Sequence, residues 1–537
     1  MILDAGSLPN GKDVKTDVCI VGAGIAGITL AREFVGKDIR VCLLESGGFE
    51  PDKVTQSLYW GENTGFPYYP LDTARARFFG GTSHYWNIPL GDELFGVRLR
   101  PLDPIDFEER EWVPYSGWPF RKEHLDPFYE RAQSVCKIGP FTYDVKEWED
   151  PVQTPRLPLL NGRVKTTMFQ FASRDLFFSK YRNEISSSDM ITAFLHANVT
   201  DIETNRTAGS VTRLRIAGLN GKKFYLSAKL FILALGAIET PRLLMLSNKI
   251  QKTGLGNQND LVGRFFMEHP HLWSGMYIPS NESIFRNSGL YGIHKVKGVP
   301  VMGKLTLSEE VIRQERILNY VASIHPKMCP APVSATHAEK KASLPVLKEH
   351  TSGNLTKHLG SAAADIGSIT KKVFRKIRDH RKIKVFLLNH MSEQLPNPDS
   401  RVMLGEECDA LGQRRVNLDW RMMPLDMRTI IRGQEIIDEE LRHAGLGRLH
   451  IEMQDDSPPP PQLTGGWHHM GTTRMHVDPK KGVVDDNCRV HGIGNLFIAG
   501  PSVFPTGGYA NPVLTIIAMA VRLADHVKGR MTGKGGS

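Results

Sequence analysis

The stretch from Asp17 to Gly47 holds the feature that most limits what this chain can fold into. An apolar run, Val18 to Val21, leads directly into a glycine-rich turn, Gly22 to Gly27, with the spacing GxGxxG. A helix-compatible stretch follows as far as Phe34, and a second apolar run, Ile39 to Leu44, completes the unit. A strand, a glycine-rich turn, a helix and a strand in this order predict a βαβ unit.

The glycines of this turn match the needs of a dinucleotide-binding unit. One glycine permits the tight turn, one lets backbone approach a pyrophosphate, and one allows close packing of helix on strand. Glu45 follows 18 positions after Gly27, at the end of the second strand, where a carboxylate suits a ribose hydroxyl. The bare spacing arises by chance roughly 0.4 times in such a chain, so the flanking elements carry the prediction. The alternative is a glycine-rich turn that binds nothing.

Two later apolar runs predict further strands of the same sheet. They are Lys229 to Gly236 and Asn495 to Gly500, and a long helix is expected from about Pro512 to Val527. The 537 residues are too many for one ordinary core and indicate two or three domains. We therefore expect a nucleotide-binding domain assembled from segments that lie far apart in the chain.

The middle of the chain has a different character. Residues 270–455 alternate strand-like runs, such as Lys384 to Leu388, with polar turns. The stretch Asp426 to Leu446, just after Pro424, has helical periodicity. The proline run 458–461 is expected to be a stiff connector back to the nucleotide-binding domain.

The positive charge of the chain is local. The formal net charge is +9, but residues 339–384 alone hold twelve Lys or Arg and four Asp or Glu. A nucleic-acid binder would carry basic side chains across a face of the fold, so no nucleic-acid partner is expected. Apolar residues at 366, 369, 373 and 377 predict a basic amphipathic helix there. This helix is either a solvated surface or a contact to an anionic membrane or an acidic partner.

The cysteines and the first residues bear on location. The six cysteines are widely separated and form no CxxC pair, which argues against zinc ribbons and thioredoxin chemistry. The first fifteen residues have no apolar signal region, and no uninterrupted apolar run approaches about 18 residues. We expect a cytoplasmic protein with reduced thiols. No metal site is expected, because the EHPH stretch at 268–271 has no third ligand at convincing spacing.

Two short stretches contain candidate catalytic residues. In the first, His468 and His469 stand side by side, and neighbours in an extended chain face opposite ways, so only one can enter a given pocket. A lone histidine is more often structural than catalytic, and both interpretations of His468 stay open. In the second, Asn511 precedes Pro512, a pair that is typical of a helix start. Asn511 is therefore either a helix cap or part of an anion-binding helix end.

Motifs along nearly the whole chain together resemble the glucose-methanol-choline (GMC) oxidoreductase family. In chain order they are GAGIAG at 22–27 with Glu45, FGGTS at 79–83, GAIETP at 236–241, VGR at 262–264, EHP at 268–270, GWHHMG at 466–471 and YANPVLT at 509–515. The chain is similar in particular to bacterial sugar and polyol oxidoreductases and, more distantly, to pyranose oxidase.

The resemblance implies an α/β fold with two parts. A Rossmann-like FAD-binding domain is expected from residues 1–99, 191–270 and 463–537. A substrate-binding domain with an antiparallel sheet is expected from residues 100–190 and 271–462. The basic segment 339–384 falls within this second domain.

The resemblance also implies roles for individual residues. His468 would be the catalytic base and Asn511 its partner. The residues expected to bind FAD are Gly22, Gly24, Gly27, Glu45, Gly80, Gly81, Ser83, Asn87, Val199, Ala234, Gly500, Asn511 and Thr515. In some relatives a histidine just after the GG-x-S element attaches FAD covalently, but Tyr85 stands there and His84 lies one place early. We therefore expect FAD that is not covalently bound.

The implied activity is oxidation of a hydroxyl of a sugar, polyol or glycoside to a carbonyl, with hydride transfer to flavin N5. Oxygen, a quinone or a redox protein would take the electrons. Three alternatives stay open: an FAD-containing lyase of the same family, an oxidase of aminocyclitol glycosides, and a nicotinamide-dependent dehydrogenase.

Overall fold

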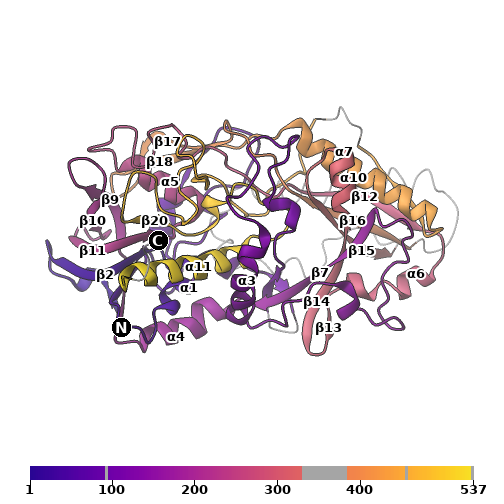
Figure 1. Ribbon diagram of the computed structural model, residues 1–537, viewed down its shortest axis with the longest axis horizontal. Helices are drawn as coiled ribbons and strands as arrows, with labels where there is room; N and C mark the ends of the chain where they lie inside the picture. Colours follow the sequence, from indigo (N-terminus) through magenta and orange to yellow (C-terminus); the bar gives the residue numbers. More distant parts are fainter. Residues whose placement is uncertain (91–94, 329–383, 454–457, 534–537) are drawn as a thin grey trace.

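The structure is a computed structural model that describes residues 1–90, 95–328, 384–453 and 458–533. The predicted basic helix therefore lies outside the described residues. Figure 1 shows two lobes side by side, one built on a mostly parallel sheet and one on an antiparallel sheet. Both chain ends lie in the first lobe (Figure 1).

The first sheet contains the predicted βαβ unit. Its strand order is β1-β8-β3-β2-β11-β10-β9, and β20 pairs with the end of β11. Its strands are β1 (Ile2–Asp4), β2 (Asp13–Val21), β3 (Val41–Leu44), β8 (Ile191–Leu195), β9 (Asn198–Thr204), β10 (Val211–Ala217), β11 (Lys223–Leu233) and β20 (Leu496–Ile498). Strands β1, β8, β3, β2, β11 and β20 are parallel to one another. Strands β10 and β9 continue the sheet in antiparallel pairing.

Helices cover this sheet because its central strands are apolar on both faces. Val18 to Val21 of β2 and Leu230 to Leu233 of β11 are buried. The helices of this lobe are α1 (Ile25–Glu33), α2 (Lys53–Gln56), α3 (Lys122–Cys136), α4 (Tyr181–Ser186), α5 (Gly236–Leu246) and α11 (Val513–Met531). Helix α11 packs against both α1 and α3, as its yellow ribbon shows in Figure 1.

The second sheet is antiparallel, with the order β19-β12-β16-β15-β14-β7-β6-β5 and β13 paired to β14. Its strands are β5 (Ile88–Pro89), β6 (Phe95–Leu99), β7 (Val164–Ser173), β12 (His271–Pro279), β13 (His294–Val296), β14 (Val299–Leu307), β15 (Tyr320–Met328), β16 (Lys384–Ser392) and β19 (Gly447–His450). The helices of this lobe are α6 (Ser283–Arg286), α7 (Glu309–Glu315) and α10 (Pro424–His443).

The two faces of this second sheet have different surroundings. One face packs on α10 through a core that includes Ile324, Leu388 and Ile436. On the other face Phe169, Val321 and Met391 cluster with Tyr509, which belongs to the loop before α11. This second face is therefore turned towards the first lobe. A small third sheet joins β17 (Arg401–Cys408), β18 (Arg414–Asp419) and β4 (Gly61–Asn63).

The predicted fold class is confirmed: an α/β protein with a Rossmann-like sheet from distant segments and a separate antiparallel sheet. The segment boundaries are less simple than expected. Strands β5 and β6 fall within the first expected segment, 1–99, but pair into the antiparallel sheet. Helices α3 and α4 fall within 100–190 but share the core of the first lobe. The division into domains stays a prediction.

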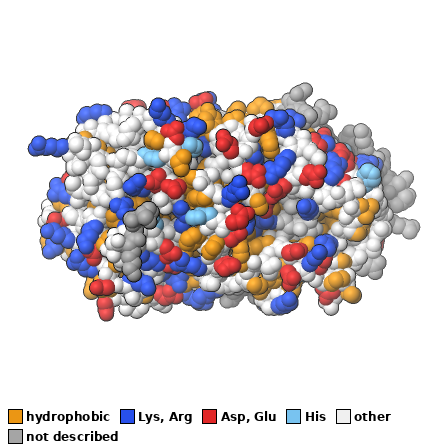
Figure 2. Space-filling model, viewed as in Figure 1, with side chains coloured by type: hydrophobic (Ala, Val, Ile, Leu, Met, Phe, Trp, Pro, Cys, Tyr) orange, Lys and Arg blue, Asp and Glu red, His pale blue; other side chains and the backbone are white. Residues whose placement is uncertain are grey.

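The surface agrees with a near-neutral described chain. On the face seen in Figure 2, acidic and basic side chains are interspersed and neither sign dominates. Among the described residues, no helix has the length and apolar character needed to cross a lipid bilayer.

Candidate active site

A cavity of about 340 Å³ lies where the two lobes meet. Its wall on one side comes from the carboxyl ends of parallel strands, including Gly22, Glu45 and Ala234. Its wall on the other side includes Arg98 of β6 and His271 of β12, from the antiparallel sheet. In open α/β sheets, ligands bind outside the carboxyl ends of the strands, and this cavity has that position.

The glycine-rich turn is shaped for backbone contact with a ligand. Gly22 has φ +104°, and a Cβ at Gly27 would lie 1.8 Å from the carbonyl oxygen of Gly22. Gly27 therefore allows helix and turn to touch. At Gly24 no protein atom lies within 4 Å of an added Cβ, so this position opens into the cavity. The first turn of α1 follows directly, and helix N-termini favour phosphate.

Glu45 braces this turn. One carboxylate oxygen accepts from the backbone N–H of Ala23 at 2.9 Å, and the other accepts from the backbone N–H of Gly47 at 2.9 Å. The side chain is nearly buried, yet it lines the cavity. Its position beside the turn agrees with the expected place of a ribose, and that role stays a prediction.

The structure brings most of the predicted site residues to this cavity. Those that line it are Gly22, Gly24, Glu45, Gly81, Asn87, Ala234, Gly500, His468 and Asn511. Val199 lines a second, smaller cavity of about 50 Å³, which shares Gly22, Ser46 and Tyr59 with the first. This second cavity extends the site in the direction expected for an adenine.

Four predicted residues do not line either cavity. Gly27 packs under the turn, as described above. Gly80 has φ +97° and forms the bend before the loop, where the Ser83 hydroxyl donates to its carbonyl oxygen at 2.8 Å. Thr515 is buried and bonds the Tyr129 hydroxyl at 2.9 Å, which ties α11 to α3. These positions support the walls of the site, and their contact with FAD stays a prediction.

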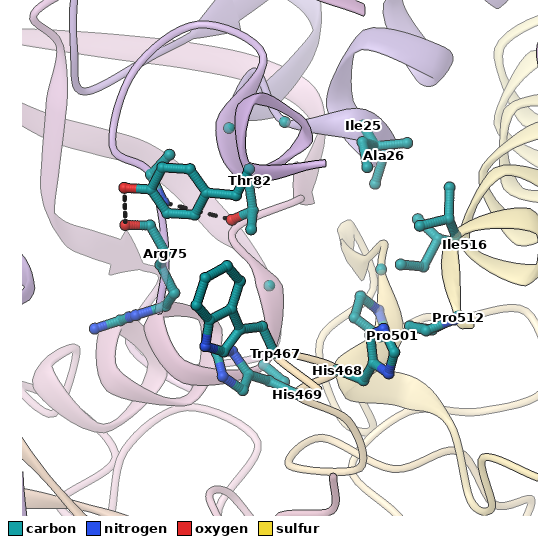
Figure 3. A pocket seen from close by; sticks show the side chains of 18 of the residues that line it. Ile25, Ala26, Arg75, Thr82, Trp467, His468, His469, Pro501, Pro512 and Ile516 are labelled. Carbon is teal, nitrogen blue, oxygen red and sulfur yellow. Dashed lines mark hydrogen bonds between the residues drawn. The ribbon is translucent and has the colours of Figure 1, made fainter. Parts of the chain in front are cut away.

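A chain of hydrogen bonds determines which ring nitrogen of His468 carries the proton. Asn511 Nδ2 lies 3.0 Å from His468 Nε2, so the amide donates and Nε2 accepts. His468 Nδ1 then donates to His269 Nδ1 at 2.9 Å, and His269 Nε2 donates to the Gly507 carbonyl oxygen at 3.3 Å. In this arrangement the one lone pair of His468 Nε2 is directed at the Asn511 amide, and both residues line the cavity. Figure 3 shows His468 between Trp467 and Pro512.

The surroundings keep His468 neutral. Its pKa lies well below the usual value, first because the ring is buried and then because His269 and His271 add positive potential. Burial likewise lowers the pKa of His269 to about 4. A neutral imidazole whose Nε2 carries no proton is the form that can accept one.

Asn511 is not a helix cap. Helix α11 begins at Val513, Pro512 is its N-cap residue, and no side-chain cap bond is made. The Asn511 amide is turned to His468 instead, and its Oδ1 atom is buried without a hydrogen-bond partner among the described residues. Buried polar atoms are rarely left unpaired, so this oxygen points to a missing partner at the site.

Glu268 binds backbone N–H groups at and just before His468, and that of its own neighbour His269. Its Oε2 atom accepts from the N–H groups of His468 at 2.9 Å, Gly466 at 3.0 Å and His269 at 3.1 Å. The Tyr68 hydroxyl donates to Oε1. The carboxyl is fully buried, and burial raises its pKa to about 7 against the opposing effect of these donors.

His469 takes the direction opposite to His468. Its Nε2 atom lies 2.7 Å from the Tyr68 hydroxyl and 3.6 Å from Glu268. Both rings reach the cavity wall, but only His468 meets Asn511. Trp467, just before them, has φ +59°. This backbone conformation is costly for a bulky residue, and such conformations are found mainly at functional sites.

Sequence reasoning missed several of these residues. It excluded a metal site at 268–271 without giving Glu268 or His269 another chemical role, and it gave no role to Trp467 or Arg98. The EHP motif stands 198 positions before Gly466 in the chain, so only the fold could bring the two together. The one local signal was the glycine pair at 465 and 466, which indicates an irregular backbone before the histidines.

The residues present fit FAD. The glycine turn and the start of α1 suit a diphosphate, the second cavity suits an adenine, and the wall beside α11 contains an orphaned amide oxygen. A dinucleotide at the carboxyl ends of the strands and a neutral histidine facing it define a flavin-dependent oxidoreductase.

Comparisons with known proteins agree with this class. Residues 396–520 match the family model described as GMC oxidoreductase. The chain is 28% identical to the fructose dehydrogenase large subunit of Gluconobacter japonicus, over 96% of this chain and 98% of that protein. It is 24% identical to the paromamine 6'-oxidase of Streptomyces fradiae, over 96% of this chain and 92% of that protein. The solved structure of a formate oxidase shares the fold, with a TM-score of 0.56, 16% identity, and coverage of 98% and 100%.

These comparisons support the GMC oxidoreductase family for this chain. It is an FAD-dependent oxidoreductase that acts on CH–OH groups. It therefore requires a small-molecule substrate and an electron acceptor.

Proposed function

We propose that this protein oxidises a hydroxyl of a sugar, polyol or glycoside to a carbonyl, with His468 as the base. The observation that carries the proposal is the unprotonated Nε2 of His468 on the cavity wall, 3.0 Å from the Asn511 amide. Bound FAD supplies the acceptor for the hydride of the carbinol carbon. The protein has to supply the proton acceptor and the position of the substrate.

The two side chains divide the work at the substrate oxygen. His468 Nε2 takes the hydroxyl proton, and the buried, neutral ring is suited to receive it. Asn511 Nδ2 donates a hydrogen bond to the same oxygen as negative charge develops on it. His269 supports the resulting imidazolium from the other side, because its Nδ1 accepts from His468 Nδ1.

Glu268 acts as a positioning residue in this proposal. It does not line the cavity, and it fixes the backbone of residues 466–468 through the N–H groups of Gly466 and His468. Without it the imidazole would lose its fixed distance to Asn511. A misplacement of about 1 Å at a reacting group can cost on the order of a hundredfold in rate.

The proposal includes FAD that is not covalently bound. His84 Nε2 bonds the Phe79 carbonyl oxygen at 2.8 Å, and its ring stacks on Phe178 with 4.0 Å between centroids. His84 therefore has partners away from the cavity, whereas Tyr85 lines it. Acid precipitation tests this point: the flavin should appear in the supernatant, and flavin retained in the pellet would contradict it.

Two of the alternatives are less well supported. The fructose dehydrogenase and the paromamine oxidase named above are oxidoreductases, which favours redox chemistry over a lyase. An aminocyclitol glycoside is cationic, and the cavity wall carries unpaired positive charge, as described in the next subsection. Oxygen, a quinone and a redox protein remain the candidate electron acceptors.

An anaerobic experiment tests the function. The FAD-loaded protein is mixed with a panel of sugars, polyols and glycosides, and the visible flavin absorbance is followed together with carbonyl product. We expect bleaching by at least one member of the panel, followed by recovery when oxygen, a quinone or a cytochrome is added. A flavin that no hydroxyl compound bleaches, in a protein that cleaves a cyanohydrin, would refute the proposal.

A further inference from the structure

One face of the antiparallel sheet is turned towards the cavity, and the strand register defines which side chains share it. Arg98 on β6 pairs with Phe171 on β7, and Lys304 on β14 pairs with Thr167 on β7. Side chains alternate along a strand, so Arg98 and Lys304 lie on the same face, with Phe169 between their positions.

The same register adds histidines to this face. Thr306 pairs with Val321, so His325 on β15 shares the face of Lys304. Continuing across β16, Met391 pairs with both Val321 and His271. His271 lines the cavity, and its ring centroid lies 5.9 Å from that of His468. The face that reaches the proposed base is therefore lined with basic side chains.

Arg98 has no acidic partner. It lines the cavity, its Nε atom is buried without a hydrogen bond, and no ion pair to it exists within the described residues. Arg75 lines the opposite wall of the same cavity and is paired with Glu239 at 2.8 Å. Buried arginines are normally paired in this way. Within the part of the chain that the structure describes, Arg98 therefore differs from Arg75 in having no carboxylate beside it.

Lys304 is more unusual still. It is 1% exposed, and its ammonium nitrogen lies 5.0 Å from the centroid of the Phe169 ring. Among the described side chains, none accepts a hydrogen bond from it. A buried lysine without an acid is costly for the free protein, so it needs a functional reason.

The pKa shifts of these groups agree with their lying near one another on this face. Burial and then the charge of Arg98 hold the pKa of Lys304 well below its usual value. Burial, Lys304 and Arg98 lower the pKa of His325 to about 4. Burial and then Arg98 among other cations lower the pKa of His271. Every charged neighbour in these three environments is basic.

We propose that the substrate is a hydroxyl compound that carries an anionic oxygen group, a carboxylate or a phosphate, bound by Arg98 and Lys304. This inference rests on the function proposed above and names the substrate class of the same site. The anionic group would place the reacting hydroxyl at His468 and Asn511, while His271 lies between the anion and the base. Sugar acids and sugar phosphates both contain this chemistry.

Matched substrates provide the test. Three parent compounds, a methyl hexoside, a pentitol and glycerol, are each used in neutral, carboxylate and phosphate form. Binding is measured by calorimetry in a His468→Ala background, which removes turnover, and bleaching of the flavin is measured with the intact protein. We expect at least one carboxylate or phosphate to bind about tenfold or more tightly than its neutral parent, as charge-assisted hydrogen bonds do. The carboxylate series and the phosphate series then show which of these two anionic groups the site prefers.

Two variants test whether Arg98 and Lys304 cause the preference for an anionic substrate. Lys304→Met and Arg98→Met should each weaken binding of the anion by about tenfold and leave the neutral parent unchanged. Lys165→Met is the matched control, since Lys165 lies on the same face of β7, in register with Thr306, but is exposed. FAD content and melting temperature confirm that each variant is folded.

The outcomes separate this inference from the proposed function. If no anion binds more tightly than its neutral parent, or if both variants keep the preference, the inference is wrong. If a neutral hydroxyl compound bleaches the flavin as well as its anionic forms do, the function stands and the inference fails. If anions bind through Arg98 and Lys304 but nothing bleaches the flavin, the anion site stands and the oxidation fails.

Discussion

Arg75 and Arg98 line opposite walls of one cavity, and they differ in what surrounds them. Arg75 is paired with Glu239, and the ring of Tyr59 lies 4.0 Å from its guanidinium carbon. Arg98 has neither an acid nor a filled hydrogen-bond set among the described residues. The charge of Arg75 is balanced by the protein, whereas the charge of Arg98 has no balancing carboxylate among the described residues.

The two walls also differ in which atoms face the cavity. On the parallel-sheet side, backbone at Gly22 and Gly24 forms the contact surface. On the antiparallel side, long side chains from strands far apart in the chain form it. Backbone contact suits a ligand that never changes, and side-chain contact suits one that must be selected. The predictions below test this division, from the largest expected effect to the smallest.

Substitution of Gly27 should have the largest effect. An alanine Cβ there would lie 1.8 Å from a backbone oxygen, which no side-chain movement can relieve. We expect Gly27→Ala to lower the free energy of unfolding by more than about 3 kcal/mol, above the usual range for overpacking, and to yield protein without FAD. Chemical denaturation and flavin absorbance measure the two effects.

Gly24→Ala is the matched control for that variant. Nothing in the protein opposes a Cβ at Gly24, so the stability without FAD should not change. The methyl group enters the cavity, so the affinity for FAD should fall. A variant at Gly24 that binds FAD as well as the parent protein would remove the turn from the proposed FAD site.

Asn511→Ala tests the reacting side of the site. It removes the amide at 3.0 Å from His468 and, in the proposal, the donor to the substrate oxygen. Loss of such a donor typically costs about 10²–10³ in rate, or about 2.7–4 kcal/mol. We expect this loss in the rate of flavin bleaching at saturating substrate, with FAD content unchanged. An unchanged rate would leave Asn511 without a role at the oxygen.

Substitution of Arg75 and substitution of Arg98 should have different effects on the free energy of unfolding. Arg75→Met removes a buried partner of Glu239, although Arg242 still lies 3.1 Å from that carboxylate. We expect a loss of about 1–3 kcal/mol in the free energy of unfolding. Arg98→Met leaves no carboxylate behind, so stability should stay the same or rise. A loss for Arg98→Met as large as for Arg75→Met would contradict the comparison between the two walls.

Glu268 should give the smallest effect, a change in the pH dependence of stability. Its pKa is raised to about 7 by burial, above the ordinary value of 4.5, so the folded protein binds this proton more tightly. The stabilising contribution is present below 4.5 and is lost as the pH rises through 7. We expect Glu268→Gln to flatten this decline in denaturation curves. A decline of the same slope in the variant would assign it to another group.

The sequence was informative where structure is local. The βαβ unit, the strands that end at Leu233 and Ile498, and the last helix were all predicted, because each depends on an apolar run and a nearby glycine. The helix after β18 was predicted from periodicity, and it begins at Pro424 itself because proline is accommodated in a first turn. The cavity-lining glycines and His468 came from motifs.

The sequence was uninformative where the site depends on long-range pairing. Arg98 and Lys304 are ordinary basic residues in strand-like runs, and only the register of β6, β7 and β14 places them on one face. Glu268 meets the N–H groups of residues 466 and 468 only in the folded chain. The residues around Asn511 left a helix cap and an anion-binding helix end both open, and only the resemblance made Asn511 the partner of His468, which it contacts in the structure.

The central claim is that His468 takes the hydroxyl proton and is not itself needed to hold FAD. The most direct measurement is the anaerobic rate of flavin bleaching at saturating substrate in His468→Ala, together with its FAD content. The account predicts a rate lower by about 10²–10⁴, the usual contribution of a general base, with full FAD occupancy. A rate equal to that of the parent protein, or a variant that has lost its FAD, would contradict it.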